Sequence, residues 1–163
     1  MLVGVVSDTH NNIKSVKAII DIFNKEEVDY VIHTGDISKA STLQMFSNLN
    51  CKLLGVFGNN DRNEIGLEEV CEEFNFNFQE PPFLVNIFNK KIVIFHEPDS
   101  IEKYLEENKD IDIVLFGHTH RYEKRIKDNV VLFNPGESAG FFEGKNALGI
   151  INLKDLNIKR IFF

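Results

Sequence analysis

Six short apolar runs in this chain each stop at a cluster of polar residues, and this recurrence constrains the fold more than any other feature. The runs have the β-branched and aromatic composition of buried strands. The polar clusters that follow them are Asp8-Thr9-His10, His33-Thr34-Gly35-Asp36, Gly58-Asn59-Asn60-Asp61, His96-Glu97, Gly117-His118-Thr119-His120 and Asn134-Pro135-Gly136-Glu137. Loops at the carboxyl ends of strands in an open α/β sheet gather around one site, so we expect the six clusters to converge on one polar edge.

The first cluster places a carboxylate and an imidazole two residues apart, at Asp8 and His10. In a strand, residues i and i+2 project to the same side, so both side chains are predicted to reach one point. A metal ion is the partner that these two groups share. Taken alone, the pair is as compatible with a capped loop as with a metal site. The recurrence of the pattern favours the metal site.

The first half of the chain alternates predicted strands and helices. Strands are expected at residues 2–6, 29–33 and 52–57, and apolar residues at helical spacing predict helices from residue 13 to 23, over 42–49 and over 67–74. Asn11 or Asn12 is expected to cap the first helix, and Ser38 or Ser41 the second. This β-α-β-α-β-α order predicts a parallel sheet with right-handed crossovers.

The second half is mostly strands. They are expected at residues 76–78, 83–88, 92–95, 112–116, 122–126, 130–133, 147–153 and 158–163, with a hairpin turn at 89–91 and one helix near 100–108. The last four strands look antiparallel. We therefore predict an α/β fold in which two mixed sheets pack face to face with helices outside.

Length and composition favour a single domain over residues 1–163, because 43% hydrophobic residues suffice for a sizeable core. The net charge of -7 argues against a broad surface for nucleic acid or anionic membrane. Neither a signal peptide nor a membrane span is indicated. Cys51 and Cys71 lie far apart and outside any C-x-x-C pattern, which is typical of reduced thiols. We expect a cytoplasmic protein without nucleic-acid or membrane partners.

The polar clusters supply two carboxylates, one amide oxygen and four of the five histidines as potential metal ligands. These residues are Asp8, His10, Asp36, Asn59, His96, His118 and His120. Asp36 is expected to bridge two ions, because Gly35 lets the backbone approach closely. Two metals about 3.5 to 4 Å apart can bind a shared hydroxide and clamp the oxygens of a phosphate.

The imidazole-rich ligand set suits Mn²⁺, Ni²⁺, Co²⁺, Fe²⁺ or Zn²⁺ better than Mg²⁺ or Ca²⁺ alone, and we expect two divalent ions, with Mn²⁺ and Ni²⁺ as first choices. With neutral imidazoles the cluster keeps a formal excess of about +2, or about +1 with a bridging hydroxide. A phosphate ester would complete the neutralisation and a peptide carbonyl would not. The pattern therefore favours phosphoester hydrolysis over peptidase chemistry.

Several residues also have a structural interpretation. His33 lies inside its strand and is interpreted as a core histidine, or as one that orients a metal ligand from behind. Asn134-Pro135-Gly136 has the composition of a turn. Aromatic residues near the C-terminus would line a homodimer contact, line a substrate rim or lie in the core. They are Phe141, Phe142, Phe162 and Phe163.

The order of these motifs resembles the calcineurin-like metallophosphoesterases, and within them the small single-domain phosphodiesterases of bacteria and archaea. The resemblance runs over essentially the whole chain and implies a four-layer α/β/β/α sandwich. It implies one metal held by Asp8, His10, Asp36 and His120, and a second held by Asp36, Asn59, His96 and His118. It further implies that a metal-bridging hydroxide attacks phosphorus, with catalytic positions at Asp36, Asn59, Asn60, Asp61 and His96.

Two residues depart from the family pattern. Many relatives carry His where this chain has Asn60, and small relatives often carry Gly where it has Glu97. Asparagine cannot protonate a leaving alkoxide, so we expect a preference for good leaving groups such as aryl phosphodiesters. The Glu97 carboxylate is expected to narrow the site or to weaken phosphate affinity.

The leading hypothesis is a dinuclear metal-dependent phosphodiesterase acting on a small phosphodiester. The alternative, from another functional class, is a protein-binding scaffold, because the retromer subunit of vacuolar sorting has a fold that resembles the expected one. That relative departs from the ligand set, whereas all seven ligand positions are occupied here. A nuclease or nucleotide phosphatase would use the same site. The acidic composition and short chain place a nuclease lower.

Overall fold

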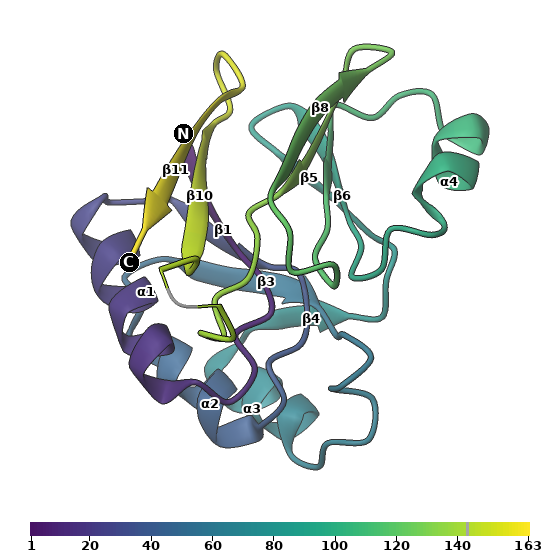
Figure 1. Cartoon of the computed structure of the whole chain (residues 1–163). Coiled ribbons are helices and arrows are strands. Elements are labelled where there is room, and N and C mark those ends of the chain that lie inside the picture. The colour runs from purple at the N-terminus through teal and green to yellow at the C-terminus, as the bar shows by residue number, and fades with distance from the viewer. Residues whose placement is uncertain (143) are drawn as a thin grey trace.

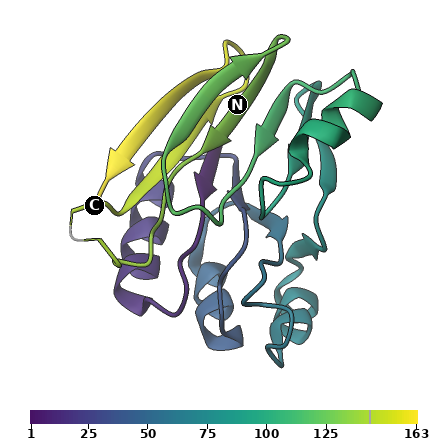
Figure 2. The same ribbon diagram turned by 45° about the vertical axis from the view of Figure 1, so that its right-hand side comes forward.

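The structure is a computed structural model that describes residues 1–142 and 144–163. Two mixed β-sheets pack face to face, and helices cover their outer faces (Figures 1 and 2). The strand order is β11-β10-β1-β2-β3-β4 in the first sheet and β5-β6-β7-β9-β8 in the second. The predicted architecture of four layers is confirmed.

Most element bounds fall within one or two residues of the predicted ones. The first sheet contains β1 (Leu2–Val6), β2 (Tyr30–His33), β3 (Lys52–Val56), β4 (Asn77–Gln79), β10 (Ala147–Asn152) and β11 (Asn157–Phe162). The second contains β5 (Phe83–Ile87), β6 (Lys90–Ile94), β7 (Ile113–Leu115), β8 (Glu123–Lys127) and β9 (Val130–Asn134). The helices are α1 (Ile13–Lys25), α2 (Ala40–Met45), the short 3₁₀ helix η1 (Phe46–Asn48), α3 (Leu67–Phe74) and α4 (Ile101–Glu107).

Alternation along the strands divides the core into three layers of apolar contact. In β1, Val3 and Val5 face the second sheet, while Val6 faces α1 to α3. In β6, Ile94 faces the first sheet, while Val93 faces α4. A strand buried on both faces must be apolar at every position, which is why these runs show no alternation with polar residues.

The parallel strands of each sheet are adjacent. β1, β2, β3 and β4 pair in parallel in the first sheet, and β6, β7 and β9 pair in parallel in the second. In Figure 1, α1, α2 and α3 lie together against the first sheet, while α4 lies beyond the second. The parallel strands of each sheet, four in the first and three in the second, therefore deliver their carboxyl ends to a common region.

Two local predictions are wrong. Helix α2 has Lys39 at its N-cap with no side-chain hydrogen bond, so neither Ser38 nor Ser41 caps it. The turn between β5 and β6 lies at Phe88 and Asn89, both with positive φ, one residue before the predicted position. Asparagine tolerates this conformation. Asn12 caps α1 as predicted, accepting a hydrogen bond from the Ser15 N–H at 3.1 Å.

Among the described residues, no helix has the length and apolar character needed to cross a membrane.

Candidate metal centre

The predicted ligands converge at the carboxyl ends of the parallel strands. Those from the first sheet follow β1, β2 and β3, and those from the second follow β6 and β7. Ligand atoms of Asp8, His10 and His120 lie within 4.8 Å of one another, and so do those of Asp8, Asp36 and His96. Residues separated by more than 100 positions in the chain thus share one site.

One set of ligands surrounds His10 and His120. Their Nε2 atoms lie 3.4 Å apart, and His120 Nε2 lies 3.5 Å from Asp8 Oδ1. His10 Nε2 lies 3.9 Å from Asp36 Oδ2. Donor atoms about 2.1 Å from one ion stand about 3.0 to 3.5 Å apart, so most of these spacings match the edges of a coordination shell.

The other set surrounds Asn59. Its Oδ1 lies 3.0 Å from both His96 Nε2 and His118 Nδ1, and these two nitrogens are 3.3 Å apart. His96 Nε2 also lies 3.4 Å from Asp36 Oδ1. One amide oxygen, two imidazoles and a carboxylate are suitable donors for a divalent transition metal. The residues present therefore fit a second ion beside the first.

Asp36 lies between the two sets. Its Oδ2 faces His10 and its Oδ1 faces His96, so each oxygen of one carboxylate is directed to a different set. Asn60 fixes this orientation through its backbone N–H to Oδ1 at 2.9 Å and its side-chain Nδ2 to Oδ2 at 2.7 Å. Each oxygen therefore lies where a carboxylate shared by two ions would need it.

The backbone around the ligands has an unusual conformation. Five predicted ligands have positive φ: Asp8 (50°), His10 (42°), Asp36 (60°), His118 (64°) and His120 (57°). This left-handed region is costly for most residues, and Asp, Asn and His enter it most readily. The argument that placed Asp8 and His10 two apart on a strand is therefore wrong, because β1 ends at Val6. A tight loop brings the two side chains together instead.

Two glycines allow the close approach of these loops. A Cβ on Gly35, whose φ is +102°, would lie 2.6 Å from His96 Nδ1. A Cβ on Gly117 would lie 2.0 Å from Ser7 Oγ and 2.9 Å from Asp8 Oδ2. Any side chain at either position would push a ligand out of place.

Burial and neighbouring charges set the proton affinities of the ligands. Burial raises the pKa of Asp8 to about 7, against the opposing effect of hydrogen bonds from Ser7 and the His118 N–H. Burial also acts to raise the pKa of Asp36, but hydrogen bonds from His96 and Asn60 and the His96 charge outweigh it and lower this pKa. In return, Asp36 raises the pKa of His96 despite burial. Burial disfavours the charged form of Asp8, and a cation bound beside it would stabilise that form.

His33 is fully buried behind the ligands, as one of the two interpretations of the sequence predicted. Its Nδ1 accepts the Gly35 N–H at 3.1 Å, and its Nε2 lies 3.0 Å from Thr9 Oγ1. These contacts join the loops after β1 and β2. Burial lowers the pKa of His33 to about 3, so this imidazole is neutral in the folded protein.

The neutral His33 makes stability depend on pH. Its pKa is lower in the folded than in the unfolded chain, so its stabilisation is complete above about pH 6.5 and declines as the pH falls toward 3. We expect the free energy of unfolding of wild type to lose about 1.4 kcal/mol per pH unit relative to His33→Gln in that window. Urea unfolding of both proteins at pH 7, 6 and 5 measures this difference. Parallel pH profiles would contradict it.

Asp61 holds the loops and does not face the ligands. Its Oδ1 accepts the N–H groups of Ile37 and Ser38, and its Oδ2 accepts those of Asp36 and Gly58, at 2.7 to 2.9 Å. Both oxygens are thus occupied by backbone donors. The resemblance implied a catalytic position for Asp61, but the structure makes it a positioning residue behind Asp36.

Asn134 is more than part of a turn. Its side-chain Nδ2 donates to the Gly117 carbonyl at 2.9 Å and to Thr119 Oγ1 at 3.1 Å, while its Oδ1 accepts the Gly136 N–H at 2.9 Å. It therefore fastens the loop that carries His118 and His120.

Glu97, which was expected to narrow the site or to weaken phosphate affinity, lies 3.8 Å from Arg62, so its charge is partly compensated.

Sequence reasoning missed the role of Glu137. This buried carboxylate lies 3.8 Å from His120 Nδ1, on the opposite side of the imidazole from the other ligands. A carboxylate behind a metal-binding histidine holds the ring and increases its basicity. The acidic residue directly after Asn134-Pro135-Gly136 was a signal that was available in the sequence.

Removing the Glu137 charge is expected to weaken metal binding. Substitution of such an outer carboxylate typically costs about 10- to 100-fold in metal affinity, and we expect Glu137→Gln to fall in that range. Competition with a chromophoric chelator measures the affinity, with the exposed Glu106→Gln as control. Unchanged affinity in Glu137→Gln would show that the carboxylate only supports the neighbouring backbone.

Comparison with known proteins identifies the family of this chain. The calcineurin-like phosphoesterase superfamily domain matches residues 1–155. The chain belongs to this family. It is 32% identical over 163 residues to a phosphodiesterase of Methanocaldococcus jannaschii, covering 99% of this chain and 98% of that protein. It is also 29% identical over 139 residues to a probable metallophosphoesterase of Methanothermobacter thermautotrophicus, covering 83% and 76%.

Solved structures confirm the metallophosphoesterase fold. A structure described as a novel archaeal phosphodiesterase superposes with a TM-score of 0.90 at 30% identity, covering all of both chains. The phosphoesterase YfcE of E. coli gives 0.69 at 16% identity, covering 99% and 98%. Vacuolar Protein Sorting 29 from Cryptosporidium parvum gives 0.64 at 19% identity, covering 99% and 96%. At these lower identities the last two show a shared fold alone.

Proposed function

We propose that this protein is a metal-dependent phosphodiesterase that hydrolyses a small phosphodiester at a dinuclear centre. The observation that carries the proposal is the position of Asp36, which directs one carboxylate oxygen to each of two ligand sets. The name of the M. jannaschii relative, a phosphodiesterase, supports the same reaction. Residues 1–163 would act as one domain in the cytoplasm.

The residues divide between two ions. Asp8, His10, Asp36 and His120 would hold one, and Asp36, Asn59, His96 and His118 the other, with Mn²⁺ or Ni²⁺ as our first choices. When bound, such a pair supplies Lewis-acid stabilisation of phosphate charge and lowers the pKa of water. The distances between Asp8 and the ligands of both sets allow it to add negative charge to either.

The chain itself keeps the ligands in position. His96 Nδ1 lies 2.8 Å from the Thr34 carbonyl and donates to it, which leaves Nε2 free to bind a metal. Asn60 donates to Asp36 rather than projecting freely, and Asp61 holds the backbone of Asp36 itself. Such preorganised contacts reduce the rearrangement needed during the reaction.

Two alternatives predict different outcomes. A scaffold of the retromer-subunit type needs no ligand set, whereas here all seven side chains meet with spacings suited to metal binding. A nuclease or nucleotide phosphatase would share the chemistry. The net charge of -7 disfavours a long polyanion as the substrate.

Metal analysis and a phosphoester panel together test the proposal. The protein is stripped with chelator, reloaded with Mn²⁺, Ni²⁺, Co²⁺, Zn²⁺ or Mg²⁺, and analysed by mass spectrometry. We expect about two ions per chain and metal-dependent hydrolysis of bis-p-nitrophenyl phosphate that exceeds hydrolysis of p-nitrophenyl phosphate. Binding of ions without hydrolysis of any diester would favour the scaffold. Failure to hold more than one ion would overturn the dinuclear centre.

The Asn60 position should limit the range of leaving groups. A histidine there can donate a proton to a departing alkoxide, and a general acid is worth about 10²-fold or more. We expect Asn60→His to increase kcat for an alkyl phosphodiester by up to about 10²-fold while changing aryl hydrolysis little. Steady-state kinetics on both esters measure this. An equal effect on the two would show that proton donation is not what limits the reaction.

A further inference from the structure

An exposed aromatic ring lies directly against the metal centre. The ring of Phe141 stacks on that of His120, with centroids 5.4 Å apart and planes inclined by 14°. It also lies 5.1 Å from the ring of His10. These are two ligands of one ion, yet 62% of Phe141 remains open to solvent. Most of a large apolar surface is therefore free beside the position of a bound phosphate.

The backbone around Phe141 is held in place from below. The Glu137 carboxylate accepts the N–H groups of Ala139, Phe141 and Phe142 at 3.0 to 3.3 Å. Asn12 Nδ2 donates to the Ala139 carbonyl at 2.6 Å. The carboxylate that faces His120 thus also anchors this segment. Three backbone bonds to one buried carboxylate give the ring a defined place before any ligand arrives.

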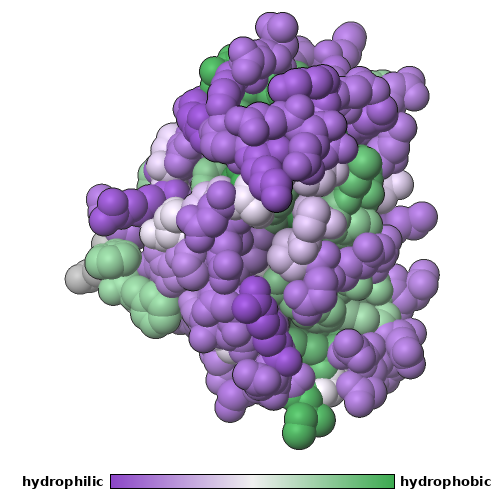
Figure 3. Space-filling model, turned by 90° about the vertical axis from the view of Figure 1, so that its right-hand side faces the viewer, coloured by the Kyte–Doolittle hydropathy of each residue, from purple (hydrophilic) through white to green (hydrophobic). Residues whose placement is uncertain are grey.

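The surroundings make an apolar ring here unusual. Figure 3, which views the molecule from the side of α4, shows a largely hydrophilic surface with patches of hydrophobic residues. An exposed aromatic ring beside two proposed metal ligands is suited to the apolar part of a ligand whose phosphate binds the ions.

We propose that Phe141 binds an aromatic substituent of the substrate, so that this site selects phosphodiesters that carry an aryl group or a nucleobase. The inference rests on the proposed function of the same site. The Phe141 ring contacts the rings of His10 and His120, so a phosphate ester bound at an ion held by these residues would bring its substituent beside Phe141, where an offset stack can form. Phe141 is in this sense a specificity-determining residue.

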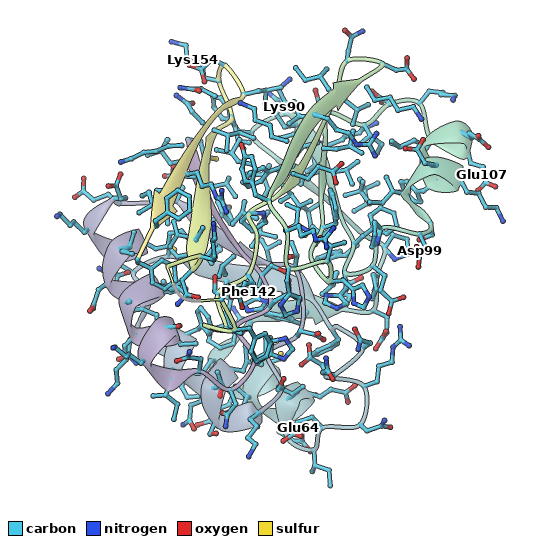
Figure 4. The ribbon with its side chains drawn as sticks, viewed as in Figure 1. Glu64, Lys90, Asp99, Glu107, Phe142 and Lys154 are labelled. Atoms are coloured by element: carbon cyan, nitrogen blue, oxygen red, sulfur yellow. The ribbon has the colours of Figure 1, made fainter. Side chains whose placement is uncertain are left out.

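Phe142 provides a matched control in the same segment. It is exposed to a similar degree, 59%, and it also donates its N–H to Glu137. Its side chain lines a different hollow, with Lys14, Ala18 and Phe163, over α1. Figure 4 shows Phe142 in the loop that precedes β10, well away from Glu107 of α4.

Two inhibitors that differ only in the ring give the test. Phenylphosphonate and methylphosphonate present the same anionic group, so the ratio of their dissociation constants isolates the contact with the ring. Calorimetry on metal-loaded protein measures both constants for wild type, Phe141→Ala, Phe141→Tyr and Phe142→Ala, with metal content checked in each. We expect Phe141→Ala to weaken phenylphosphonate about 3- to 10-fold and methylphosphonate less than about 2-fold. Phe141→Tyr and Phe142→Ala should keep the wild-type ratio.

Three outcomes would overturn the inference. Equal weakening of both inhibitors in Phe141→Ala would mean that the ring only supports the histidines. An unchanged ratio would mean that no ligand touches the ring. A smaller molecular mass of Phe141→Ala in light scattering would show that a second copy covers the ring instead. Absence of diester hydrolysis by wild type would count against the proposed function, whereas the inhibitor ratio can still be measured on the metal-loaded protein.

Discussion

Asp36→Asn is expected to reduce kcat for bis-p-nitrophenyl phosphate by about 10³-fold or more, because losing one anionic bridge removes several kcal/mol of transition-state stabilisation. Asparagine preserves the size of the side chain but offers only one oxygen, so it cannot face both His10 and His96. In wild type the backbone N–H and the side-chain Nδ2 of Asn60 each donate to one oxygen of Asp36. In Asp36→Asn, the new NH₂ group would face one of these donors and that hydrogen bond would be lost. Steady-state kinetics combined with metal analysis measure the loss.

The metal content of Asp36→Asn separates two explanations for this loss. We expect the variant to hold fewer ions than wild type, since Asp36 is the residue shared by both sets. Asp21→Asn, on the exposed side of α1, changes the formal charge equally and should keep wild-type activity and metal content. An Asp36→Asn protein that retained both ions and wild-type kcat would show that Asp36 does not bridge.

The convergence of the ligands was predictable because it follows from strand order. Consecutive β-α-β units place the ends of β1, β2 and β3 at one edge, so Asp8, Asp36 and Asn59 had to come together there. The same reasoning, applied to buried apolar runs, placed His96 and His118 at strand ends, which lie in the second sheet of the structure. Side-chain chemistry and strand patterns are both properties of the local sequence, which is why they suffice to predict that the ligands converge.

The conformation of the loops was not predictable in the same way. Asp8 and His10 were assigned to a strand face because the apolar run before them reads as a strand, but β1 ends at Val6 and both residues have positive φ. Hydrogen bonds from the Asp8 and His10 N–H groups to the carbonyls of Gly35 and Asp36 fix this turn. These bonds join segments that are distant in the chain, so no local pattern reports them.

The roles of Glu137 and Asp61 were hidden for a related reason. Each carboxylate accepts several backbone N–H groups from a loop that folds over it, and backbone donors have no signature in the sequence. The family resemblance placed Asp61 among the catalytic positions because it belongs to the same motif as the metal ligand Asn59. Only its partners distinguish a group that positions the loops from one that reaches the substrate.

Asp61→Ala is expected to lower the free energy of unfolding by about 3 to 5 kcal/mol, because each buried donor left without an acceptor costs about 1 to 3 kcal/mol and entering water recovers part of it. Four backbone N–H groups, from Gly58 and from residues 36–38, would lose their acceptor together. Asp61→Asn should also be destabilised, since its NH₂ would face donors. Urea unfolding of metal-free protein measures both.

Glu64→Ala is the control for Asp61→Ala. Glu64 is half-buried and lies in the same loop, and its backbone N–H bonds to the backbone carbonyl of Asp61, a bond that neither substitution removes. We expect its stability to remain within about 0.5 kcal/mol of wild type. Since the Asp61 bonds hold Asp36 from behind, the metal affinity of Asp61→Asn should fall together with its stability. A stable Asp61→Asn with reduced kcat but normal metal affinity would instead place Asp61 in direct contact with the substrate, because a residue that acts only through the loops cannot change kcat without changing how they hold the ions.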